Sequence, residues 1–135
     1  MRVFQFAFSD SEDNTHLPHN YCENCIAYTG THDNNTLLGY LYEIDDETRK
    51  RIFAYCGIEP TSDISFGVSA VMRVLLSSSA SKVIFPIQDI FGFGCDTRMN
   101  TPGVASGNWA YRITVEQLMA LDRAKLRFQN ELYFR

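Results

Sequence analysis

Three short apolar runs without polar alternation constrain the fold of this chain more than any other feature. They cover residues 3–8, 25–29 and 82–87, and more than half of their residues are β-branched or aromatic. A strand with one buried face alternates apolar and polar residues, whereas a strand of a parallel sheet is apolar on both faces. The runs therefore predict three strands of a parallel sheet, with a polar loop over residues 9–24.

Helical patterns fill the interval between the second and third runs and the end of the chain. The predicted helix caps, in chain order, are Asn34 or Asn35, Asp45 or Asp46, Ser62 or Asp63, and Thr114, which with Gln117 matches a capping box. Gly57 is placed to end the second helix. The last helix is predicted to continue through Leu132, because apolar residues recur at helical spacing from Leu118 onward.

Strands that alternate with helices predict an α/β fold with parallel strands joined by helical crossovers. Three parallel strands do not complete a sheet, because both outer edges would stay unpaired. A complete (β/α)8 barrel takes about 250 residues, and this chain has 135. The chain is therefore predicted to be a piece of a TIM barrel, a single incomplete domain over residues 1–135.

Composition excludes several classes of partner. The 12 Lys and Arg residues are outnumbered by 16 Asp and Glu, so the net charge of −4 disfavours nucleic acid. No stretch approaches the roughly 20 apolar residues of a membrane span, so no membrane partner is expected. The four cysteines are too few and too widely spread for a disulfide framework, which favours a reducing, cytoplasmic location.

The sharpest local feature is a histidine–aspartate pair, His32 and Asp33, just after the second apolar run. In a β/α barrel the carboxyl ends of the strands form the active-site face. The pair is therefore a candidate for catalysis or substrate binding. An equally open alternative is that Asp33 only caps the following helix.

Three weaker patterns each have an ordinary structural alternative. His16, His19, Cys22 and Cys25 are spaced three residues apart like zinc ligands, but Pro18 interrupts any shared helical face. Residues 92–94 (GFG) lack the third glycine of a dinucleotide loop. The loop at 98–109 ends in the single tryptophan, Trp109, which suits a sugar-binding rim but equally an inward-packed side chain. No metal and no cofactor are predicted.

Six segments, in order and in register, resemble one known family. They are residues 5–8 (QFAF), 17–21 (LPHNY), 28–34 (YTGTHDN), 86–89 (PIQD), 98–103 (RMNTPG) and 107–109 (GNW). Together they resemble the C-terminal part of the 4-alpha-glucanotransferases, also called amylomaltases or disproportionating enzymes, of glycoside hydrolase family 77. The resemblance implies the last three strands of a (β/α)8 barrel and substrates that are maltooligosaccharides or other α-1,4-glucans.

The resemblance also implies a retaining double displacement, in which a carboxylate nucleophile forms a glycosyl-enzyme and an acid/base residue serves both steps. It assigns Asp33 the role of the third carboxylate, which stabilises the transition state. It makes His32 and Asn100 substrate-binding residues at the same sugar.

The departures from the family pattern define what the chain lacks. The family's nucleophile and acid/base lie upstream, and the acids of the polar loop here (Asp10, Glu12, Asp13 and Glu23) do not replace them. Cys22 and Asn35 stand where the family more often has Pro and Asp. Two alternatives stay open: a non-catalytic α-glucan-binding module, and a split-barrel complement that needs a partner chain supplying the missing N-terminal part.

The isolated chain is predicted not to disproportionate maltotriose, because two of the three catalytic carboxylates are missing from it. The measurement is glucose release from maltotriose by the purified chain. Release above the level of a protein-free control would contradict the prediction.

Overall fold

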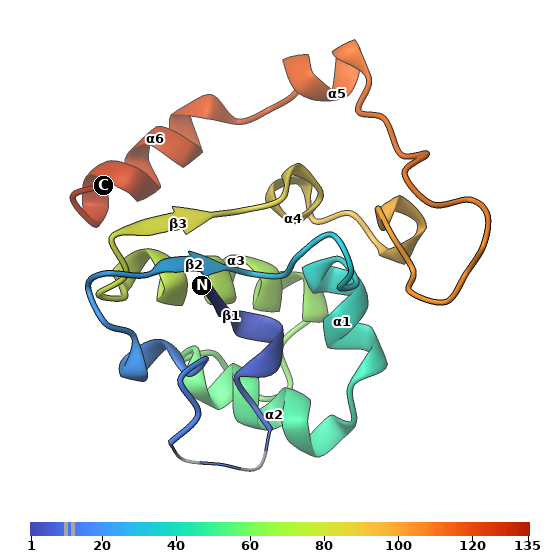
Figure 1. The fold of residues 1–135 in the computed structure, drawn as a ribbon. Helices are drawn as coiled ribbons and strands as arrows, with labels where there is room; N and C mark the ends of the chain where they lie inside the picture. The colour runs from blue at the N-terminus through green and yellow to red at the C-terminus, as the bar shows by residue number, and fades with distance from the viewer. Residues whose placement is uncertain (10, 12) are drawn as a thin grey trace.

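The fold is described from a computed structural model that covers residues 1–9, 11 and 13–135. The acids Asp10 and Glu12 of the polar loop lie outside the described residues. Figure 1 shows a small sheet near the centre, with helices behind it and below it and the two C-terminal helices above it.

The sheet has three parallel strands, as the apolar runs predict. They are β1 (Arg2–Val3), β2 (Ile26–Tyr28) and β3 (Lys82–Ile84), in the order β1-β2-β3. Ala27 on the central strand pairs with Arg2 on one side and with Val83 on the other. Parallel pairing brings the carboxyl ends of all three strands to one edge of the sheet.

The strands are shorter and less buried than the apolar runs predict. β1 ends at Val3, and the rest of the first run forms a 3-10 helix, η1 (Phe4–Phe6), followed by a turn. Periodicity alone does not separate a strand from a helical turn in so short an apolar run. β3 was predicted to be buried on both faces, and this is wrong, because Ile84 is 45% exposed. A second 3-10 helix, η2 (Pro18–Asn20), lies in the polar loop.

Three helices, α1 (Leu37–Glu43), α2 (Asp46–Tyr55) and α3 (Ile64–Ser77), lie between β2 and β3. Asp45 caps α2, and its carboxylate accepts a hydrogen bond from the Thr48 amide. Asp63 caps α3 through the Ser65 amide. Both caps are among the predicted ones, since an Asp just before an apolar-periodic segment satisfies amides that the first helical turn leaves free.

The core is built from the sheet and these three helices. Its fully buried members include Phe4, Leu41, Phe53 and Val71. α3 packs against this cluster at Gly67. A Cβ at this position would lie only 2.7 Å from the Phe53 ring. The absence of a side chain at this position lets the helices approach closely.

The chain after β3 contributes little to the core. α4 (Ile87–Phe91), the 3-10 helix η3 (Cys95–Thr97), α5 (Val115–Met119) and α6 (Arg123–Leu132) follow in order. None of residues 90–135 is buried. The apolar side chains of the last two helices are open to solvent: Phe128 is 63% exposed and Met119 is 74% exposed.

The C-terminal helix is divided, contrary to the single helix predicted. The predicted capping box is present. The Thr114 hydroxyl accepts from the Gln117 backbone amide, and the Gln117 side-chain oxygen accepts from the Thr114 backbone amide. The helix that it starts ends at Met119, and Asp122 caps a new one. At the end of the chain, the Arg135 guanidinium donates to three carbonyls that follow or end α3, those of Leu76, Ser78 and Ala80.

Within the part of the chain that the structure describes, no helix has the length and apolar character needed to cross a membrane. All four cysteines are free thiols.

Replacing Gly67 with alanine is expected to destabilise the chain. Alanine favours a helix by about 1 kcal/mol, but the new methyl group would press on Phe53 and on Leu41, whose Cδ1 lies 2.9 Å from the ideal Cβ position. Overpacking of this kind costs about 1–3 kcal/mol, so the net loss of unfolding free energy is about 1 kcal/mol. Urea denaturation measures it. A gain in stability would contradict this packing, and Phe53→Leu in the same chain should lessen the effect of Gly67→Ala.

Candidate functional site

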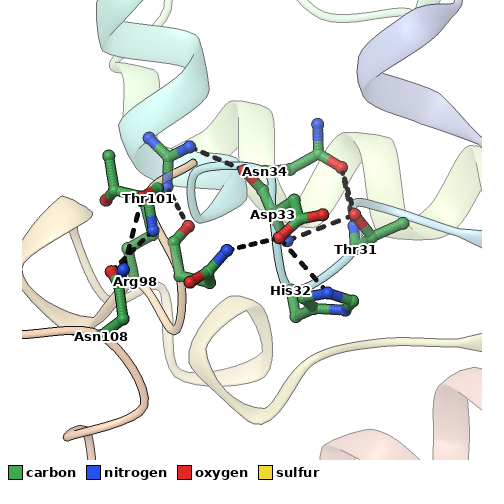
Figure 2. A network of polar contacts seen from close by, with 8 residues as sticks. Thr31, His32, Asp33, Asn34, Arg98, Thr101 and Asn108 are labelled. Carbon is green, nitrogen blue, oxygen red and sulfur yellow. Dashed lines mark hydrogen bonds and ion pairs between the residues drawn. The ribbon is translucent and has the colours of Figure 1, made fainter. Parts of the chain in front are cut away.

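The loop between β2 and α1, residues 30–36, carries the predicted histidine–aspartate pair. Asn34 closes this loop on itself, because its Oδ1 accepts hydrogen bonds from the Thr31 amide at 2.9 Å and the Thr31 hydroxyl at 2.8 Å (Figure 2). Side-chain amides commonly stabilise tight turns in this way. His32 and Asp33 lie between these two bonded residues and are fixed by them.

Asp33 does not cap the helix that follows. The cap of α1 is Thr36, whose hydroxyl accepts from the Gly39 amide at 3.1 Å. The prediction of Asn34 or Asn35 as the cap is therefore wrong by one or two residues. The alternative that Asp33 only caps this helix is also wrong, and the Asp33 carboxylate is available for another role.

A second loop, directly after η3, reaches this carboxylate. The Asn100 side-chain amide donates to Asp33 Oδ1 at 2.6 Å, and its backbone amide donates to the His32 carbonyl at 3.1 Å. Arg98 bridges the two loops, since its guanidinium donates to the carbonyls of Asp33 and Asn100 at 2.7 and 2.9 Å. His32 Nε2 lies 3.3 Å from Asp33 Oδ1. All three predicted site residues therefore meet in one place.

The pair is open to a ligand. The side chains of His32 and Asp33 are 56% and 51% exposed. They border an open pocket of about 830 Å³, which Phe6, Tyr28 and Pro86 also line. A few polar groups converging in a largely apolar concavity are typical of small-molecule sites.

Trp109 lies beside this pocket and is not packed inward. Its ring centroid is 5.1 Å from that of His32, and the side chain is 52% exposed. Its backbone has a φ of 61°, which is unusual for a bulky residue, and its amide donates to the Met99 carbonyl at 2.6 Å. Asn108 ties the same loop together by accepting from the Thr101 amide at 2.8 Å (Figure 2).

Asp89 belongs to the motif at residues 86–89, but its role in the site is visible only in the structure. It lies in α4, is 2% exposed, and accepts hydrogen bonds from the Thr29 hydroxyl at 2.5 Å and the Leu37 amide at 2.7 Å. Burial raises the pKa of this carboxyl, whereas the two hydrogen bonds act in the opposite direction. An acid just after an apolar run is the signal in the sequence that points to this position.

The weaker sequence patterns have structural explanations. The Nδ1 atom of His16 accepts from the Val3 amide at 2.9 Å, and His19 Nδ1 lies 2.9 Å from the Tyr55 hydroxyl. Among the described residues, no three His, Cys, Asp or Glu side chains gather as metal ligands would. Gly92 is the left-handed C-cap of α4, whereas the glycines of a dinucleotide loop open a helix.

Comparison with known proteins identifies the family. The model of glycoside hydrolase family 77, described as 4-alpha-glucanotransferase, matches residues 1–118. The chain belongs to this family. The family resemblance of the six sequence segments is thereby confirmed.

Similar proteins come from bacteria and plants. A 4-alpha-glucanotransferase of Synechocystis is 40% identical over all of this chain and 26% of its own length. A chloroplastic/amyloplastic 4-alpha-glucanotransferase of Arabidopsis thaliana is 44% identical over 84% of this chain and 19% of its own. An amylomaltase from Streptococcus agalactiae, solved in complex with acarbose, superposes with a TM-score of 0.89 at 32% identity, covering the whole chain and 27% of that structure. The chain thus spans between 19% and 27% of the length of these relatives.

Replacing His32 with alanine is expected to shift the fluorescence of Trp109 to longer wavelength, because the indole would exchange a ring contact for water. The chain has one tryptophan, so the emission spectrum reports this position alone. His19→Ala is the matched control, since that ring contacts Tyr55. An unchanged spectrum in His32→Ala, or an equal shift in His19→Ala, would contradict the contact.

Proposed function

We propose that the chain is the part of a 4-alpha-glucanotransferase that binds and stabilises the reacting sugar, in an enzyme that transfers α-1,4-glucan segments between maltooligosaccharides. The observation that carries the proposal is the half-exposed Asp33 carboxylate, which lines the pocket together with His32 and accepts a hydrogen bond from Asn100. Membership of family 77 supports the same activity.

Asp33 stabilises the transition state in this proposal. Retaining transfer passes through an oxocarbenium-like state with positive charge on the sugar ring. A carboxylate held in place before the reaction stabilises that charge without reorganising. The Asn100 amide and the His32 ring hold it, and both also present polar groups to sugar hydroxyls.

The nucleophile and the acid/base come from outside this chain. Of the described residues that line the pocket, Asp33 and Asp89 carry carboxylates. Asp89 is nearly fully buried and hydrogen-bonded on both oxygens, so it is not free to attack a sugar. Retaining enzymes place their two reacting carboxyl groups about 5 Å apart across the scissile bond. The described lining of the pocket offers no such pair of free carboxylates, so the chain alone is inactive.

The chain fits a C-terminal piece of a (β/α)8 barrel, one incomplete domain over residues 1–135. The small parallel sheet has two outer strands, β1 and β3, and in a closed barrel each would pair with a further strand. Coverage of about a quarter of each relative supports a missing remainder. The main partner is then the N-terminal part of the same barrel.

A split-barrel complement is the second candidate. It is favoured by the exposed apolar side chains of α5 and α6, such as Met119 and Phe128. Large exposed apolar surface marks a place where another protein surface binds. In this candidate the missing part of the barrel is supplied by a separate chain.

The chain is expected to bind maltoheptaose through Asp33, and the fluorescence of Trp109, beside His32, measures the binding. Replacing Asp33 with asparagine should weaken the affinity about tenfold, because a hydrogen bond to a charged group is lost. Acarbose, the ligand of the Streptococcus agalactiae amylomaltase, is the second probe.

Asp63→Asn is the matched control for this titration, since Asp63 is an exposed cap of α3 away from the pocket. It should bind like the unaltered chain. A chain that binds neither sugar, or an Asp33→Asn variant with unaltered affinity, would contradict the proposed function.

A further inference from the structure

One buried carboxylate lies directly behind the loop that carries Asp33. Asp89 is 2% exposed, and its two oxygens accept from different partners. Oδ2 accepts from the Thr29 hydroxyl, and Oδ1 from the Leu37 amide. Hydrogen bonds to a charged acceptor in a dry environment are among the strongest in proteins.

The two donors are the residues on either side of the site loop. Thr29 directly follows β2 and precedes residue 30, and Leu37 is the first residue of α1 and follows residue 36. A single side chain, 60 residues from Thr29 and 52 from Leu37 in sequence, therefore joins both ends of the loop. The ends cannot separate or slide unless one of these bonds breaks.

The interior of the loop leaves little room for another arrangement. A Cβ at Gly30 would lie 2.6 Å from Gln5 Nε2 and 3.2 Å from Asn34 Cβ. Gln5 also donates to the Asn35 carbonyl at 2.8 Å. Because Asp89 fixes both ends of the loop, these contacts determine the position of Asp33.

We propose that Asp89 is a positioning residue of the proposed glucan site. It is nearly fully buried and both of its oxygens already accept hydrogen bonds, so it acts by holding residues 30–36 in the position where the Asp33 carboxylate meets Asn100. A preorganised group loses less conformational freedom when the ligand binds. The effect on sugar binding rests on the proposed function. The clamp, meaning the two hydrogen bonds from Thr29 and Leu37 to Asp89, can be tested without a sugar.

Amide hydrogen exchange measures the clamp directly. Asp89→Ala removes both acceptors, so exchange within residues 30–36 should accelerate roughly tenfold or more. Thr29→Val removes one bond while keeping the shape of the side chain, and its effect should be smaller. Asp89→Asn should exchange nearly as slowly as the unaltered chain, because its amide can accept from Leu37 and donate to the Thr29 hydroxyl oxygen.

Val71→Ala is the matched control, because it removes buried side-chain volume from α3, outside residues 30–36, and should lower the overall stability. Its exchange should rise in α3 and not in residues 30–36. Loop exchange that is unchanged in both Asp89→Ala and Thr29→Val would overturn the clamp. Acceleration in Val71→Ala equal to that in Thr29→Val would also overturn it, since the loop would then follow overall stability.

Maltoheptaose binding separates this inference from the proposed function. We expect Asp89→Ala and Thr29→Val to lose affinity in the order of their loop exchange, and Asp89→Asn to retain it. If the unaltered chain binds and both clamp variants bind equally well, the positioning role is wrong and the proposed function stands. If the unaltered chain does not bind, the proposed function fails, whereas the exchange data still test the clamp.

Discussion

Strand β2 pairs in parallel with β1 on one side and β3 on the other, and the rest of the site depends on this pairing. Parallel pairing aligns the carboxyl ends of the strands. The segment after β1 (Gln5), the loop after β2 and the helix after β3 (Asp89) therefore emerge side by side. Antiparallel pairing of the same runs would separate Thr29 from Asp89, and the loop would lose its clamp.

Asp33 and Asp89, both at this edge of the sheet, have different roles because one is exposed and the other is buried. Asp89 is buried, and burial raises its pKa while donors from two segments satisfy its oxygens. Asp33 is half exposed and faces a pocket, with Asn100 and His32 as its neighbours. Environment assigns carboxylates their roles. The buried one holds structure, and the open one is available to a ligand.

Much of the local structure could be predicted because its causes are local. Asp45 and Asp63 cap their helices, and Thr114 forms its capping box, since a cap and its amide are only two or three residues apart. The first apolar run was mispredicted beyond Val3, because an apolar run suits any buried conformation. The C-terminal pattern predicted a helix with an inward face, but that face needs a partner surface and stays exposed at Phe128.

The pattern of residues alone predicts the three parallel strands, the caps of α2, α3 and α5, the family motifs and the candidates His32, Asp33 and Asn100. It does not predict that Asn100 donates to a carboxylate 67 residues away, or that Asp89 joins both ends of the loop; the folded chain establishes these contacts. The difference follows from distance along the chain. Propensity and capping act within a few residues, whereas these contacts exist only after the sheet has brought its carboxyl ends together.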